Sequence, residues 1–166
     1  ACAEAVVALA GARGGGPAPA GGAGRGAACM GGWLHDTGAG VAFTDEAGNV
    51  ILPLGDEGGP VTLLMAHTDT VFPDLEPMPR RVEDGVMYCP GVGDDTASVA
   101  VLMPAARHAV QRHLPPAPGA PGFAFNPREE GRGKRQGCRA LAERAGRAPQ
   151  SGRPRAAAGC TRWARA

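Results

Sequence analysis

The feature that most constrains the fold is a continuous apolar run at residues 60–67, PVTLLMAH, which ends abruptly in polar residues. Two glycines precede it, so turn residues bound it on one side and a His, a Thr and an Asp follow on the other. A run of this length and composition predicts a buried strand, of the kind found in sheets that are covered on both faces. The same pattern delivers His67 and Asp69 to the carboxyl end of that strand.

Strand and helix patterns alternate along the rest of residues 33–145. We predict a hairpin around Asp45–Asn49, an extended pair with its turn at Asp84–Gly85, a helix that begins near Asp95 or Thr96, a short strand at 122–126 and a helix at 137–146. Pro104 lies inside the first helical pattern and is expected to kink or shorten it. The class that follows is α/β, with a mixed, mostly parallel sheet and flanking helices.

Composition divides the chain into three parts. Residues 1–32 are expected to form a low-complexity Gly/Ala/Pro arm, because residues 11–28 contain only Gly, Ala, Pro and Arg. Residues 33–146 are expected to form the folded domain. Residues 147–166 show no apolar period and are expected to be a basic, disordered tail.

Charge and cysteine usage exclude several classes of function. The net charge of +1 gives no overall field that would attract nucleic acid or a membrane, and no apolar run reaches the length of a membrane span. The five cysteines show no paired spacing, so we expect neither a disulfide framework nor a structural zinc site. Free cysteines are typical of a reducing compartment, and we therefore expect a cytoplasmic location. The arginine-rich tail leaves nucleic-acid binding as a minor alternative.

The first candidate site is His67 with Asp69. Residues two apart on an extended chain point to the same side, so one ring nitrogen could bind a metal while Asp69 accepts a hydrogen bond from the other. Taken alone, an H-x-D pattern is more often an ordinary polar pair at the start of a loop.

Two acidic pairs follow. Asp94 and Asp95, in GVGDD, precede a predicted helix, where they could simply favour the helix N-terminus or could bridge two cations. Glu129 and Glu130 follow the strand at 122–126. A lone Glu-Glu pair is usually surface charge, but such a pair is useful where one member binds metal and its neighbour moves a proton.

Taken together, LLMAHTDTVFP, RVEDGVMYCPGVGDDTASVAVLM and FNPREEGRGKRQGCRALAERA resemble the di-zinc family of peptidase T, carboxypeptidase G, acetylornithine deacetylase and succinyl-diaminopimelate desuccinylase. The resemblance is strongest to the peptidase T-like and carboxypeptidase G-like members, and first to those like peptidase T. The resemblance covers roughly residues 33–145 and rests on three motifs in the family's order. It implies a partial three-layer zinc-exopeptidase catalytic domain that hydrolyses amide bonds.

The resemblance also implies roles for single residues. His67 would bind the first zinc, Asp94 would bridge both zincs, and Glu130 would bind the second. Asp69 would orient His67, and Glu129 would be the general base. Two zinc ions, replaceable by Co or Mn, would activate a water for attack on a small peptide or an N-acyl amino acid.

Several departures from the family pattern shape the expectation for this chain. A further acidic ligand is expected some two dozen residues after Glu130, where SGRPRAA has none, and no His follows His113. The lid or dimerisation domain has no counterpart, which leaves the oligomeric state open. Only one Lys stands among seventeen basic residues, which fits a truncated product with an out-of-frame tail. We therefore expect weak activity or none, and the alternative is a non-catalytic relic that retains part of the metal site.

Overall fold

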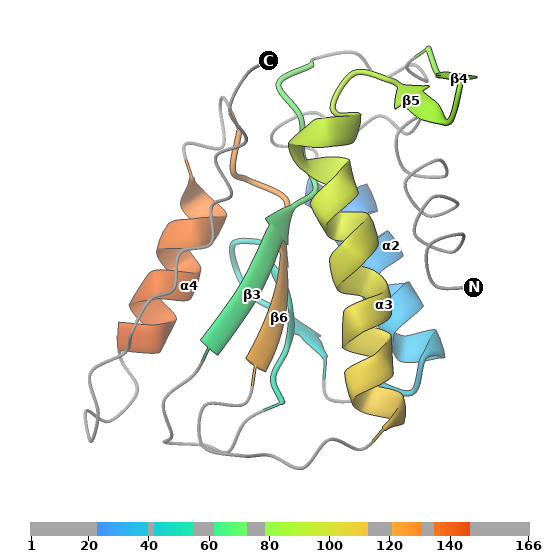
Figure 1. Ribbon diagram of the computed structural model, residues 1–166. Coiled ribbons are helices and arrows are strands. Elements are labelled where there is room, and N and C mark those ends of the chain that lie inside the picture. The colour runs from blue at the N-terminus through green and yellow to red at the C-terminus, as the bar shows by residue number, and fades with distance from the viewer. Residues whose placement is uncertain are drawn as a thin grey trace.

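The computed structural model describes residues 23–39, 42–54, 62–72, 79–112, 121–130 and 135–146. The tail at 147–166 and most of the N-terminal arm lie outside these ranges, as do the predictions made for them. The described residues form a sheet covered by helices on both faces (Figure 1). None of the described helices is long and apolar enough to cross a lipid bilayer.

The main sheet has the strand order β1-β2-β6-β3. Its members are β1 (Phe43–Thr44), β2 (Val50–Leu52), β6 (Pro121–Asn126) and β3 (Thr62–His67). β3 and β6 are parallel, whereas β1 pairs with β2 and β2 with β6 in antiparallel fashion. The α/β class with a mixed sheet and flanking helices is confirmed. The prediction of a mostly parallel sheet is wrong for the described strands.

The two predicted hairpins are confirmed. β1 and β2 enclose the turn at Asp45–Asn49, and the carboxylate of Asp45 accepts a hydrogen bond from the main-chain N–H of Asn49 at 2.8 Å. The second hairpin consists of β4 (Arg81–Glu83) and β5 (Val86–Tyr88), with Asp84 and Gly85 at positive φ in the turn between them. It forms a separate two-stranded sheet that precedes the loop with Asp94.

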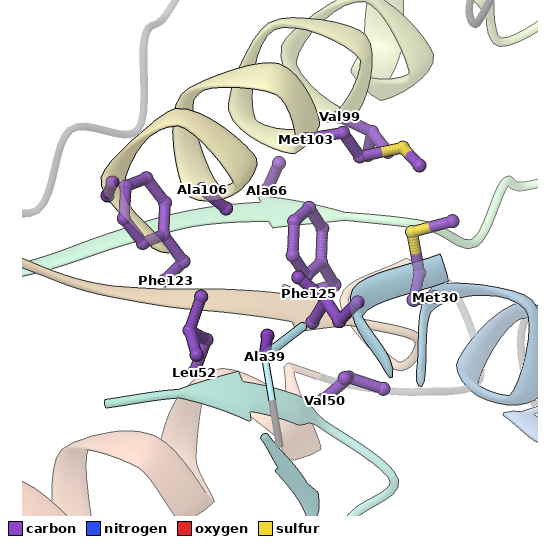
Figure 2. Packing of buried hydrophobic residues seen from close by; sticks show 12 residues of the cluster. Met30, Ala39, Val50, Leu52, Ala66, Val99, Met103, Ala106, Phe123 and Phe125 are labelled. Carbon is purple, nitrogen blue, oxygen red and sulfur yellow. The ribbon is translucent and has the colours of Figure 1, made fainter. Parts of the chain in front are cut away.

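The core lies on both faces of the sheet and depends on the two-residue period of β6. Phe123 and Phe125 point toward α2 (Ala23–Asp36) and α3 (Ala97–Gln111), whereas Ala124 lies on the opposite face in a cluster with Leu141 of α4 (Gln136–Gly146). Figure 2 shows the first cluster, in which Met30 approaches Phe125 from α2 and Met103 approaches from α3. The result is the three-layer arrangement that the family resemblance implies.

Three expectations need correction. The strand with the longest apolar run, β3, lies at the edge of the described sheet with Leu64 41% exposed, while the buried central strand is β6. The boundary predicted at residue 32 falls inside helix α2, which packs Met30 and Leu34 into the core. Finally, α3 continues through Pro104 to Gln111, because residues on both sides of the proline pack on the sheet.

Candidate metal centre

The candidate residues meet at the carboxyl ends of the parallel strands β3 and β6. His67 is the last residue of β3 and is in register with Asn126, the last residue of β6. Glu129 and Glu130 lie three and four residues after the end of β6, and Asp94 lies in the turn Val92–Thr96 that leads into α3. Side chains from three separate stretches of sequence therefore converge where α/β sheets usually carry their sites.

The imidazole of His67 is at the centre of this arrangement. Its Nε2 lies 2.9 Å from Oδ1 of Asp94 and 3.9 Å from Oε1 of Glu130, and its Nδ1 lies 3.0 Å from the main-chain oxygen of Asp69. Burial alone would lower the pKa of His67, but the hydrogen bond to Asp94 and the charges of Asp95 and Asp69 raise it. Both ring nitrogens face oxygen acceptors, so a proton and a cation would compete for Nε2.

Asp69 contacts His67 differently from the sequence prediction. The main-chain oxygen of Asp69, not its carboxylate, is the hydrogen-bond partner of Nδ1, and the carboxylate Oδ1 is 3.7 Å from that nitrogen. The carboxylate, only 3% exposed, instead accepts hydrogen bonds from the main-chain N–H groups of Glu129 at 3.1 Å and Glu130 at 3.0 Å. Asp69 thus contacts both the histidine and the glutamate pair, a connection that nothing in the sequence indicated.

The glutamate pair lies beside the imidazole. His67, Glu129 and Glu130 each offer one ligand atom within 4.8 Å of the other two. Burial, and then the neighbouring charge of Glu129, raises the pKa of Glu130. Arg135 was not among the predicted site residues, but its Nε lies 3.5 Å from Oε1 of Glu129 and its main-chain N–H donates to the Glu129 carbonyl at 3.2 Å.

The two aspartates before α3 have different surroundings. The side chain of Asp94 is 81% exposed and reaches His67 Nε2, whereas Asp95 accepts a hydrogen bond from the main-chain N–H of His67 at 3.0 Å. Burial raises the pKa of Asp95. The sequence suggested that Asp95 favours the helix N-terminus or joins Asp94 in binding cations, and in the structure it ties the end of β3 to the Asp94 turn.

A glycine permits the close approach of this turn to the loop after β3. Gly91 has φ +73°, and a Cβ atom at that position would lie 2.8 Å from Cγ2 of Thr70. A larger residue would therefore be both strained in the backbone and in collision with the loop that carries Asp69. The placement of Asp94 beside His67 depends on this contact.

The donor set fits a zinc ion. One imidazole nitrogen and several carboxylate oxygens are ligands that zinc accepts, and two ligands of a tetrahedral zinc are about 3.3 Å apart for bonds of about 2.0–2.1 Å. His67 and Asp94 are the two residues that the family resemblance assigns to one zinc, and the 2.9 Å between His67 Nε2 and Asp94 Oδ1 is close to that value. The predicted set of His67, Asp94 and Glu130 is thus brought together, and Glu129 lies within the same cluster.

Comparison with known proteins is consistent with this geometry. A succinyl-diaminopimelate desuccinylase of Xanthomonas campestris pv. campestris is 38% identical over 96 residues, which is 52% of this chain but only 25% of the relative. The fold resembles the crystal structures of an aminopeptidase PepT from Bacillus cereus, with a TM-score of 0.58 and 21% identity, and of a tripeptidase from Staphylococcus aureus, with a TM-score of 0.56 and 19% identity. These matches cover 77% and 81% of this chain.

The chain spans 37% and 39% of those two structures, so it corresponds to part of their length. The family described as peptidase family M20/M25/M40 matches residues 63–164, a stretch that includes every candidate site residue and more than half of the chain. The resemblance inferred from the three sequence motifs is therefore confirmed, and the chain belongs to peptidase family M20/M25/M40.

Proposed function

We propose that this chain carries part of the active centre of a metal-dependent hydrolase of amide or peptide bonds. The single observation that supports the proposal most strongly is the convergence of His67, Asp94, Glu129 and Glu130 at the ends of β3 and β6. These groups come from three sequence motifs in the order typical of the family. Chance surface acids would not be expected to surround one buried imidazole.

The residues suited to hold metal are His67, Asp94 and Glu130. We assign His67 to one zinc and Glu130 to a second, with the carboxylate of Asp94 between them. When bound, two zinc ions would polarise a scissile carbonyl and lower the pKa of a water. Co or Mn could replace zinc, since both accept nitrogen and oxygen ligands.

Glu129 is the proposed general base. It is not among the assigned ligands, yet its carboxylate lies in the cluster with His67 and Glu130, within reach of a reacting water. It would take a proton from that water and deliver it to the leaving amine. Arg135, whose Nε lies 3.5 Å from its carboxylate, would restrict its orientation.

Asp69 would act by positioning these groups. Its carboxylate binds the two amide N–H groups of the glutamate pair, and its carbonyl fixes which nitrogen of His67 faces the metal. Groups that orient metal ligands in this way usually change metal affinity by about 10- to 100-fold when they are removed.

The proposed substrates are small peptides or N-acyl amino acids, as the names of the relatives suggest. We propose that the elements from α2 to α4 form part of a catalytic domain in a cytoplasmic enzyme. The three assigned residues give each of the two zincs one ligand fewer than the family pattern does. This chain by itself should therefore bind metal weakly and turn substrate over slowly.

The test combines metal content with hydrolysis. After dialysis against micromolar zinc, the folded chain should retain metal, and less than about a tenth of an equivalent would contradict the proposal. Hydrolysis of N-succinyl amino acids and tripeptides should require zinc and should be lost in Glu129→Gln, which should still bind zinc. Glu143→Gln, an exposed glutamate on α4, is the matched control. Zinc binding without any turnover that depends on Glu129 would favour the non-catalytic alternative.

A further inference from the structure

Asn126 is a fully buried polar residue at the end of β6, three positions before Glu129. Its main-chain oxygen accepts a hydrogen bond from the N–H of Thr68 at 2.7 Å, which ties β6 to the loop after His67. Its side-chain Oδ1 accepts from the N–H of Arg128 at 2.9 Å, and its Nδ2 donates to Sγ of Cys138 in α4 at 3.1 Å. One residue therefore contacts three separate segments around the candidate centre.

These contacts complete a pattern in the loop that carries the glutamate pair. The N–H groups of three consecutive residues, Arg128, Glu129 and Glu130, all donate to side-chain oxygens. Asn126 accepts the first and Asp69 accepts the other two. The main chain of the loop is thereby fixed by side chains from β6 and from the segment after β3, although the loop belongs to neither a strand nor a helix.

The amide of Asn126 is itself held in place by the first turn of α4. A Cβ atom on Gly137 would overlap the Asn126 amide oxygen, and it would lie 2.6 Å from Oδ1 of Asn49. Asn49 is also fully buried, and its Nδ2 donates to the carbonyl of Gly137 at 3.1 Å. The close packing restricts the Asn126 side chain, and its two hydrogen bonds set Oδ1 toward Arg128 and Nδ2 toward Cys138.

We propose that Asn126 is a positioning residue for the metal centre, which acts by holding the Arg128 amide and so sets where Glu129 and Glu130 point. The inference rests on the proposed function, because it assigns Asn126 a role through those two glutamates. Its physical basis is that the partly buried N–H of Arg128 would lose its acceptor, and an N–H group shielded from water without a partner is costly. The loop would otherwise turn to find another partner, and the carboxylates would turn with it.

The experiment compares three variants of the whole chain. Asn126→Leu keeps the size of the side chain and removes both hydrogen bonds. Asn126→Asp keeps the acceptor for Arg128 and removes the donor to Cys138. Cys138→Ala removes only the sulfur partner. Each variant is measured for zinc affinity, for the visible absorption spectrum with Co²⁺, and for amide hydrogen exchange of residues 123–130 without metal.

In Asn126→Leu, we expect zinc affinity to fall about 10- to 100-fold and the Co²⁺ spectrum to change. Amide exchange of Arg128 should accelerate at least about tenfold, while that of Phe123 and Phe125 stays near the wild-type rate. Asn126→Asp and Cys138→Ala should keep the wild-type spectrum and the slow exchange of Arg128. This pattern separates positioning from general destabilisation, which would speed exchange at all residues of β6.

Wild-type affinity and wild-type Arg128 exchange in folded Asn126→Leu would overturn the proposal, as would an equal effect from Cys138→Ala. If Asn126→Leu does not fold, Gly137→Ala replaces it as the test, because the added methyl group displaces the Asn126 amide without removing a polar group. We expect the same fall in zinc affinity and the same faster exchange of Arg128 in Gly137→Ala. Wild-type values of both would overturn the proposal. Failure of the wild-type chain to bind metal would refute the proposed function, whereas the metal-free exchange measurements test the positioning by themselves.

Discussion

The same substitution should affect the stability of the fold at one aspartate of the candidate centre and hardly at all at another. Asp69 is 3% exposed and accepts two main-chain hydrogen bonds, whereas the side chain of Asp94 is 81% exposed and contacts only the ring of His67 among the hydrogen bonds described. Asparagine has nearly the shape of aspartate, so Asp→Asn tests charge and hydrogen bonding without leaving a cavity. We expect Asp69→Asn to destabilise the fold and Asp94→Asn to leave its stability almost unchanged.

The magnitude follows from the contacts. In Asp69→Asn, one of the two carboxylate oxygens becomes an NH₂ group that faces the N–H of Glu129 or Glu130, so one hydrogen bond to a charged acceptor is lost. Such bonds contribute about 1.5–3 kcal/mol, and a buried N–H without a partner costs about 1–3 kcal/mol. Relief from burying a carboxylate offsets part of this. The net loss should be about 2–4 kcal/mol, against about 1 kcal/mol or less for the exposed Asp94.

Urea unfolding of the metal-free protein, with a chelator present, measures both effects. With a urea dependence of about 2 kcal/mol per molar, Asp69→Asn should lower the midpoint by about 1–2 M. Zinc affinity should fall in both variants, because one loses a positioning group and the other a ligand. The reasoning is refuted if Asp69→Asn unfolds within about 0.5 kcal/mol of the wild type, or if Asp94→Asn is equally destabilising.

Two further predictions concern pH and the core. The pKa of His67 is raised in the metal-free protein, and zinc must displace the Nε2 proton, so zinc affinity should be constant above that pKa and fall about tenfold per pH unit below it. A competition titration with a coloured chelator between about pH 5.5 and 8 checks this, and an affinity independent of pH contradicts it. Phe125→Ala, in the main cluster, should cost about 3–5 kcal/mol of unfolding free energy, whereas Val101→Ala on the exposed face of α3 should change it by about 0.5 kcal/mol or less. Similar urea midpoints for the two variants would show that the cluster does not stabilise the fold as described.

Most of the fold elements that position the centre could be predicted from local patterns. The hairpin at Asp45–Asn49, the turn at Asp84–Gly85 and the strand before Glu129 each have a strong local signature of apolar residues bounded by turn residues. The convergence of the three motifs also followed, because parallel strands present their carboxyl ends at one edge. The motifs and their order then identified the family.

What the sequence did not predict depends on long-range packing. Helix α2 begins in a segment rich in Gly and Ala, where only Met30, Trp33 and Leu34 give a helical spacing. Its formation depends on burial of Met30 and Leu34 against β6 and α3 rather than on intrinsic propensity. Similarly, the apolar run of β3 predicted burial on both faces. Burial depends instead on which strands lie between two others, and in the described sheet these are β2 and β6.

The same limit explains why Asn126, and the hydrogen bonds by which Asp69 acts, escaped prediction while the candidate ligands did not. Candidate ligands are recognised by residue type and spacing, which are local properties of a motif. Asp69 and Asn126 act through hydrogen bonds to main-chain N–H groups of the loop at 128–130, and a main-chain donor has no signature in the sequence. These two side chains are buried, whereas Asp94 is open to solvent. A centre of this kind is therefore ordered from its buried side: the interior fixes the backbone of the loop, and the backbone directs the partly buried carboxylates of Glu129 and Glu130 toward the imidazole.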